Sequence, residues 1–428
     1  MRALHSRNYR LFFSGQSVSL IGTWMTRVAT SWLIYRLTHS AFLLGLASFV
    51  GQAPLFFLAP LAGVWVDRWD RHRTLVVTQA LSMAQSFALT VLAFTGAIQV
   101  WHVIALMLMQ GVVNAFDMPA RQAFLIQMID DRADLPNAIA LNSSMVNAAR
   151  LIGPAVAGVL IAGVGEAWCF LIDGVSYMAV IASLLAMHVK PALRRNRTTK
   201  IWQELAEGWR YVTGSVPIRS ILLLLALVSL LGMPYTVLMP VFAAQILKGG
   251  AHTLGMLMAS VGVGALAGAL ALATRRSVLG LGRVMPISAL LFGGSLIGFG
   301  LSKWLWLSML LLVLSGFGMM RQMAASNTIL QTILEEEKRG RVMAFYAMAF
   351  AGMSPFGSLL AGTAAAKSGA PVTVVASGAC CILGAFLFTR ELPRIRAAIR
   401  PIYVQLGILP EVAAGIQSAS RLQTVSDD

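Results

Sequence analysis

Five ionisable residues lie inside long apolar stretches of this 428-residue chain, where a charge is costly. They are two acids, Asp117 and Asp173, and three arginines, Arg27, Arg150 and Arg321. A charged side chain near the centre of a bilayer costs about 3 kcal/mol on insertion scales, so each must face protein, water or a partner. A desolvated carboxylate suits proton transfer, and a guanidinium can hold an oxyanion through two parallel hydrogen bonds. These residues are therefore candidates for proton coupling and for binding an anionic or zwitterionic solute.

Long apolar segments predict the helices that would position these side chains. A helix rises about 1.5 Å per residue, so about 20 residues cross the roughly 30 Å of hydrocarbon in a bilayer. The chain is 57% hydrophobic and 12% charged, whereas soluble domains are about 25% charged. The sequence therefore predicts an all-α polytopic membrane protein. Its twelve expected transmembrane helices span residues 11–35, 42–66, 74–98, 102–125, 139–164, 168–189, 219–242, 253–274, 284–302, 305–328, 342–366 and 371–390.

The formal net charge of +16 is distributed unevenly between the two sides of the predicted membrane. If residues 63–73 lie in the cytoplasm and the sides then alternate, inner segments hold 26 of the 33 Lys and Arg residues and outer loops hold four. An excess of basic residues on the cytoplasmic side is the usual orientation signal. We therefore expect both termini in the cytoplasm, with inner arginines facing anionic lipid headgroups rather than nucleic acid.

A polar interruption at residues 190–217 divides the chain into two halves. We expect a six-helix bundle at 1–189, a cytoplasmic linker at 190–217, a second six-helix bundle at 218–391 and a cytoplasmic tail at 392–428. The Trp-rich stretch at 202–211 predicts an interfacial helix within the linker. An offset of 204 residues matches several positions of the two halves, which predicts pseudo-symmetric bundles. These matches are Gln127 with Gln331, Gly153 with Gly357, and Gly158 with Gly362.

The sequence shows no pattern typical of a disulfide framework, a metal site or a nucleotide-binding loop. Cys169, Cys380 and Cys381 lie in apolar segments without C-x-x-C spacing, and the six histidines form no metal-binding pair. The chain lacks a phosphate-binding G-x-x-x-x-G-K-[ST] loop. We therefore expect no metal, no cofactor and no enzymatic activity, and a monomer whose partners are a small-molecule substrate, protons and membrane lipids.

The hairpin at residues 63–73 resembles the loop between helices 2 and 3 of the major facilitator superfamily. That loop has the pattern G-x-x-x-D-R/K-x-G-R-R/K, and Asp70 stands where the family usually has Gly. The resemblance implies twelve helices in two bundles and an inner gate in which the loop pairs with neighbouring helices. The residues assigned to this gate are Gly63, Asp67, Arg68, Arg71 and Arg73.

Other stretches are similar to the enterobactin-exporter-like branch of that superfamily. They are residues 22–29, 114–124, 137–143, 147–154 and 339–343. The resemblance implies a bacterial inner-membrane exporter of siderophores, macrolides or other small molecules, coupled to protons as an antiporter. Gly153, Pro154 and Gly158 also resemble the antiporter motif of helix 5, although Ala157 replaces one of its glycines. From their size alone, these three residues form either a packing seam or hinge between helices, or neutral positions facing lipid.

Three partners are open for Asp117. Arg321 lies 204 residues away and would face it across a pseudo-symmetric cavity as an inner gate. Arg121 lies four residues away on the same helix face. The family resemblance implies Arg71 of the loop. Asp117 is the preferred proton carrier, and Asp173, near the outer rim, is either a second carrier or a structural acid.

The three arginines outnumber the two embedded acids, which favours an anionic substrate such as a siderophore. Asn142 and Asn147 add neutral hydrogen-bonding groups to the predicted substrate site of Arg27, Arg150 and Arg321. The structural alternative is that each arginine is paired with an acid or with the carbonyl groups at the end of a helix. Polyspecific drug or macrolide efflux, a lysolipid flippase and a non-transporting receptor remain alternative functions.

Overall fold

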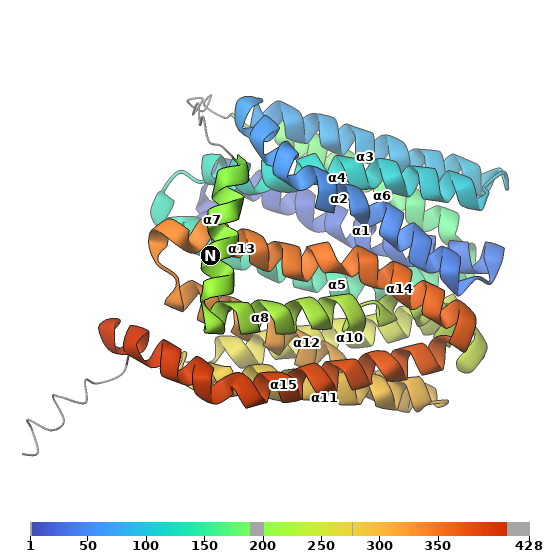
Figure 1. The fold of residues 1–428 in the computed structure, drawn as a ribbon. Coiled ribbons are helices and arrows are strands. Elements are labelled where there is room, and N and C mark those ends of the chain that lie inside the picture. Colours follow the sequence, from blue (N-terminus) through green and yellow to red (C-terminus); the bar gives the residue numbers. More distant parts are fainter. Residues whose placement is uncertain (1, 189–200, 276, 409–428) are drawn as a thin grey trace, which may run out of the picture.

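Helices alone build the regular structure of the described residues in this computed structural model, which are 2–188, 201–275 and 277–408 (Figure 1). Eleven of the described segments are long and apolar enough to cross a membrane. The remaining long helix, α1, is more polar and brings the number to the twelve that the sequence predicts. The all-helical polytopic fold is thereby confirmed.

The first six long helices form one bundle, of which α2, α3, α4 and α6 are drawn in the upper part of Figure 1. Within it, α1 packs against α5 and α6, and α3 packs against α4 and α6. Short 3₁₀ turns at Arg2–His5 and Arg132–Asp134 precede α1 and α5. The bounds are α1 Arg7–Thr38, α2 Ala41–Arg68, α3 Arg71–Phe94, α4 Val100–Met128, α5 Leu135–Val164 and α6 Glu166–Leu185.

The second bundle contains two spans that are interrupted by π-helical turns. The seventh span consists of α8 Val216–Leu227, η3 Val228–Gly232, α9 Tyr235–Val241 and η4 Phe242–Ile246. The eleventh consists of α13 Glu336–Ala347, η5 Met348–Gly352 and α14 Met353–Ser368. The uninterrupted helices are α10 Ala251–Ala273, α11 Leu281–Leu301, α12 Leu305–Ile333 and α15 Ala370–Gln405.

Two predicted boundaries can be compared with these helices. The linker contains the helix α7, Ile201–Gly214, as the Trp-rich stretch predicts, whereas residues 189–200 lie outside the described part. The last helix, α15, continues without a break to Gln405, past the predicted start of the tail at 392. Its buried Leu392, Ile395, Ile399 and Tyr403 recur every three or four residues, which gives this basic segment one apolar helix face. The assignment of the segments to separate domains stays a prediction.

Turn geometry repeats at the predicted 204-residue offset. Gly165 and Gly369 precede α6 and α15, with φ angles of +91° and +86°. This left-handed region favours glycine because a Cβ atom would be strained there. The same tight connection therefore joins helices five and six of each half, as expected for pseudo-symmetric bundles.

The two bundles meet along α5 with α10 and along α2 with α14. Both seams depend on glycine pairs close to one end of the helices. A Cβ added to Gly158 would lie 2.9 Å from the Cα of Gly255, and one added to Gly45 would lie 2.8 Å from the Cα of Gly362. The backbones therefore touch at this end, which is the predicted outer end.

Candidate functional site

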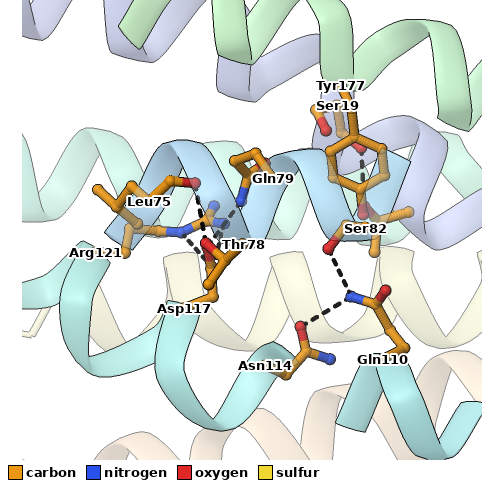
Figure 2. Close-up of polar contacts among 11 residues, drawn as sticks. Ser19, Leu75, Thr78, Gln79, Ser82, Gln110, Asn114, Asp117, Arg121 and Tyr177 are labelled. Atoms are coloured by element: carbon orange, nitrogen blue, oxygen red, sulfur yellow. Dashed lines mark hydrogen bonds and ion pairs between the residues drawn. The ribbon is translucent and has the colours of Figure 1, made fainter. Parts of the chain in front are cut away.

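Asp117 lies at the centre of a polar seam between α3 and α4 (Figure 2). Its Oδ1 accepts hydrogen bonds from Thr78 Oγ1 at 2.8 Å and Gln79 Nε2 at 2.7 Å. Its Oδ2 accepts from Arg121 Nε at 3.1 Å and Nη2 at 2.5 Å. Of the three partners considered for Asp117, Arg121 is the one that the structure pairs with it. Asp117 is 7% exposed, and its carboxylate accepts four hydrogen bonds. It therefore links α3 to α4.

The same seam continues towards the other end of α4. Gln110 Nε2 donates to Ser82 Oγ at 3.1 Å and to Asn114 Oδ1 at 3.2 Å (Figure 2). Paired side chains at successive turns join the two helices without reaching the second bundle. The cross-cavity pair of Asp117 with Arg321 is not formed in this conformation: no carboxylate of the described residues lies within 4 Å of Arg321.

The predicted gating hairpin is a two-residue turn between α2 and α3. Asp70, the departure from the family pattern, caps α3 by accepting a hydrogen bond from the Arg73 amide at 3.0 Å. Asp at this position stabilises the start of α3, because an acid at the N-cap accepts a hydrogen bond from a backbone N–H that has no partner within the helix. Trp65, Trp69 and Phe116 stack beside the turn. The side chains of Asp67 and Arg68 and the surroundings of Gly63 lie outside the described residues, so the gating role of the loop, including Arg71 and Arg73, stays a prediction.

Asp173 occupies a different environment, inside the first bundle between α1, α3 and α6. It is 2% exposed, and its Oδ2 accepts a hydrogen bond from Ser86 Oγ at 2.9 Å. Thr23 and Thr26 of α1 lie beside the carboxylate. Its Oδ1 has no hydrogen-bond partner, and no basic group of the described chain lies within 4 Å. In contrast to Asp117, this carboxylate is neutralised by no cation.

Trp24 brings together two of the predicted substrate-binding arginines. The guanidinium carbon of Arg27 lies 4.7 Å from the centre of the indole ring, and that of Arg150 lies 5.3 Å from it. These are cation–π distances. Since Arg27 comes from α1 and Arg150 from α5, the ring connects two helices. Neither guanidinium lies within 4 Å of a carboxylate of the described residues.

Gly153 permits this approach. A Cβ at Gly153 would collide with the Cβ of Trp24 and would lie 3.0 Å from the backbone oxygen of Ile21. The glycine therefore lets α5 touch α1 one turn from Arg150. Gly153 thus packs within the first bundle, whereas Gly158 packs across the two bundles, and the carbonyl of the buried Pro154 lies against Gly255 at the same seam. The packing interpretation of these residues agrees with the geometry, and their role in gating stays a prediction.

Tyr235 of α9 belongs to the second bundle and lies in the electrostatic neighbourhood of Arg150. The residue is 1% exposed, and its hydroxyl lies beside Ser315 but makes no hydrogen bond of standard geometry to the described residues. The Nε of Arg150 is also buried and unpartnered. Such groups cost about 1–3 kcal/mol each when left unsatisfied, so they indicate a place for water or a ligand. We call Trp24, Arg27, Arg150 and Tyr235 the arginine–tryptophan site.

Arg27 shows that this site borders accessible space. Arg27 is exposed, whereas its neighbours Val28 and Ala29 on α1 are buried. Its positive charge also repels that of Arg150, which helps to keep the pair suited to an anion.

The other predicted substrate residues lie elsewhere. Asn142 accepts a hydrogen bond from the Tyr9 hydroxyl at 3.1 Å, so it joins α5 to the start of α1. Asn147 donates to the Ser143 carbonyl of its own helix at 3.0 Å. Arg321 lies over the ring of Phe317, 5.1 Å from its centre, with its Nε unpartnered. The structure therefore brings Arg27 and Arg150 together and separates Asn142 from them.

Sequence reasoning missed Trp24 and Tyr235. The signal for Trp24 was available, since it precedes Arg27 by three residues and shares its helix face. Tyr235 belongs to the other bundle, and only the tertiary fold relates it to Arg150.

Comparison with known proteins gives the family. A profile described as transmembrane secretion effector, of the major facilitator type, matches residues 2–405. The staphyloferrin A transporter of Staphylococcus aureus is 27% identical over 363 residues, covering 82% of this chain and 88% of that protein. The multidrug efflux pump Tap of Mycolicibacterium fortuitum is 24% identical, covering 83% and 88%. Macrolide efflux protein A of Streptococcus pyogenes is 26% identical, covering 62% and 67%.

Solved structures agree on the fold. A bacterial homologue of the human lysosomal transporter Spinster, in an inward-facing and unoccupied conformation, superposes with a TM-score of 0.69 at 13% identity, covering 92% of this chain and 99% of that one. A bacterial homologue of ferroportin in an inward-facing state gives 0.68 at 15% identity, covering 90% and 98%. With twelve helices, glycine seams and a profile match along nearly its whole length, the chain belongs to the transmembrane secretion effector family of the major facilitator superfamily and is a membrane transporter, not an enzyme.

Proposed function

We propose that this transporter exports a small organic anion of the siderophore type from the bacterial cytoplasm in exchange for protons. The observation that carries the proposal is the arginine–tryptophan site, in which Arg27 and Arg150 share one indole ring without a carboxylate partner. It acts as a monomer in the inner membrane, with both termini in the cytoplasm.

Charge decides the substrate class. Two guanidiniums without acids leave a positive site, and guanidinium binds carboxylate or catecholate oxygens in bidentate fashion. A lipophilic cation would be repelled by the same pair. The similarity to a staphyloferrin A transporter supports a siderophore. The similarity to macrolide and multidrug efflux proteins keeps drug efflux as the alternative.

The seams suggest how access alternates. Gly158–Gly255 and Gly45–Gly362 hold the predicted outer ends together, and this supports access to the arginine–tryptophan site from the cytoplasmic side. Release outside requires both seams to part. Because Arg150 and Tyr235 belong to different bundles, a bound anion that contacts both would favour movement of the bundles as a unit.

Asp173 is our candidate for the proton site. Asp117 already has an arginine partner, whereas the polar partners of Asp173 among the described residues are hydroxyl groups. A buried carboxylate without a cation gains most from taking up a proton. Thr23 and Thr26 stand beside Asp173 on the same helix as Arg27, so α1 connects the proton site to the substrate site.

Inside-out membrane vesicles test the function directly. With an imposed pH gradient, we expect uptake of a radiolabelled carboxylate or catecholate siderophore and little uptake of a macrolide. Arg27→Gln and Arg150→Gln should each reduce siderophore uptake about 10-fold or more, since a charged hydrogen bond contributes about 1.5–3 kcal/mol. Arg10→Gln, an exposed change on the same helix as Arg27, is the matched control. Macrolide uptake that both arginine variants retain would establish drug efflux instead.

A further inference from the structure

A groove of about 540 Å³ lies on the outer half of the membrane-facing surface, away from the arginine–tryptophan site. It runs between α5, α10 and α12. Its walls include Ala155 and Val159 of α5, Met256 and Ala259 of α10, and Trp306 and Leu310 of α12. The volume is within the range of about 300–1,000 Å³ that is typical of small-molecule sites.

Small residues make the groove, and a glycine seam closes its floor. Ala155 and Ala259 leave space between larger neighbours such as Val159, which is 71% exposed. Below them the backbones of Gly158 and Gly255 touch, so the groove does not lead into the protein interior through this seam. Its occupant must therefore come from the surrounding membrane.

Three basic residues lie at or close in sequence to the predicted outer end of the groove. His252 lines that end, and Lys248 lies four residues before it, in the loop between η4 and α10. Lys303 immediately precedes Trp304 and α12, the helix that forms the opposite wall. Both lysines are exposed, and neither lies within 4 Å of a carboxylate of the described residues.

This gathering is unusual because the outer side has so few basic residues. The predicted outer loops hold only Arg36, Lys248, Lys303 and Lys367. Arg36 is paired with Glu166. Two of the three remaining outer cations therefore lie within four residues of a side chain that lines the groove, Lys248 near His252 and Lys303 near Trp306. Trp304 and Trp306 are 76% and 79% exposed, which is typical of the belt where lipid headgroups begin.

We propose that the groove is a binding site for one anionic glycerophospholipid of the outer leaflet. One acyl chain would lie along the alanine-lined groove, and the phosphate would lie among Lys248, His252 and Lys303. The apolar walls suit the acyl chain of the lipid, and the positive charge of the basic residues suits its phosphate.

The site would also act on the transport cycle. Ala155 and Val159 belong to the first bundle, whereas Met256, Ala259 and Trp306 belong to the second. A chain in the groove therefore contacts both bundles above the Gly158–Gly255 seam. A ligand that binds one conformation better shifts the population towards it, so the lipid should favour the closed outer side.

Native mass spectrometry of the purified full chain tests lipid binding. In micelles with equal amounts of phosphatidylglycerol and phosphatidylcholine, we expect wild type to retain one phosphatidylglycerol in preference to phosphatidylcholine. Lys248→Gln with Lys303→Gln should reduce this preference at least fivefold, because each basic residue near a membrane surface adds about a fivefold attraction for anionic lipid. Ala259→Phe should remove the bound lipid by filling the groove. The controls are Lys367→Gln, an outer lysine elsewhere, and Ala162→Phe, an exposed position of α5 outside the groove.

Fluorescence gives an independent measurement of the location. Phosphatidylglycerol with brominated chains should quench wild type at a lower lipid fraction than brominated phosphatidylcholine does, and Trp306→Phe should remove that difference. Equal retention of the two lipids by wild type would overturn the proposal. So would a loss of binding in Ala162→Phe as large as that in Ala259→Phe.

Discussion

Gly158 of α5 and Gly255 of α10 touch backbone to backbone across the two bundles, and a Cβ on Gly255 would lie 2.7 Å from the Cα of Gly158. The pair has a symmetric counterpart. Gly362 lies 204 residues after Gly158, and it touches Gly45 in the same way. Such small residues let membrane helices approach closely without a hydrophobic driving force. The predicted outer side is therefore closed by two equivalent seams, one on each side of the molecule.

Gly158→Val should wedge one seam open. The added isopropyl group has no space against the Gly255 backbone, so the outer ends of α5 and α10 must separate. We expect transport to fall at least 10-fold while the protein still inserts. In a background without native cysteines, Ser48→Cys, at the second seam, should be labelled several-fold faster by a membrane-impermeant maleimide added outside.

Gly163→Val is the matched control for this wedge. Gly163 lies on the same helix, and nothing lies within 4 Å of a Cβ added there. Normal transport in Gly158→Val, or equal loss in Gly163→Val, would contradict a role of the seam in gating.

Trp24→Leu should weaken substrate binding more than it weakens the fold. Loss of the ring removes two cation–π contacts, each contributing about 0.5–2 kcal/mol, so the guanidiniums of Arg27 and Arg150 lose their fixed orientation. We expect the KM for the exported anion to rise about 5- to 30-fold with a small change in maximal rate. Trp101→Leu, at an exposed position of α4, should leave the KM unchanged. An unaltered KM in Trp24→Leu would separate the ring from the substrate site.

Asp117 and Arg121 should be coupled in stability. The two residues lie on the same face of α4 and are joined by charged hydrogen bonds. These bonds orient the Asp117 carboxylate towards Thr78 and Gln79 of α3. We expect Asp117→Asn and Arg121→Gln to be non-additive by about 1 kcal/mol in a thermal double-mutant cycle in detergent, a modest value because Arg121 is partly exposed. The same cycle with Arg321→Gln should be additive. If Asp117→Asn were non-additive with Arg321→Gln and additive with Arg121→Gln, the result would support a gate in which Asp117 pairs with Arg321 across the cavity.

Asp173→Asn should uncouple export from the pH gradient. An amide cannot titrate, although it still accepts a hydrogen bond from Ser86. We expect substrate exchange at equilibrium to persist while uptake driven by the gradient falls to the level without a gradient. Gradient-driven uptake that persists in Asp173→Asn but is lost in Asp117→Asn would move the proton site to Asp117.

Topology makes a prediction that needs no substrate. The 26-to-4 partition of basic residues places residues 194–200 inside and Leu247–Ala251 outside. Reporter enzymes that work only in the cytoplasm should be active when fused at 194–200, and reporters that work only outside should be active at 247–251. The reverse result would invert the molecule and place the glycine seams on the cytoplasmic side.

Some features follow from the sequence because they depend on neighbours along the chain or on composition. Uncharged runs of 25 or more residues, as in 42–66, require helices that cross a bilayer, whatever their partners. The match of Gly158 with Gly362 indicated two related halves, and the four-residue spacing of Asp117 and Arg121 allowed their pairing. In each case helix geometry alone relates the residues.

Tertiary structure decided which of the allowed partners meet. Asn142 and Arg150 lie on one helix, and only the fold turns the first towards Tyr9 and the second towards Trp24. The sequence favoured Asp117 over Asp173 as the proton carrier because Asp173 lies near the predicted outer rim. The Thr78 and Gln79 partners of Asp117 come from another helix and could not be foreseen. Tyr235, in the electrostatic neighbourhood of Arg150, belongs to the other bundle. Periodicity specifies the face of a helix on which a residue lies, but packing between helices far apart in sequence decides what that face contacts, and with it whether a buried charge is neutralised or left for a ligand.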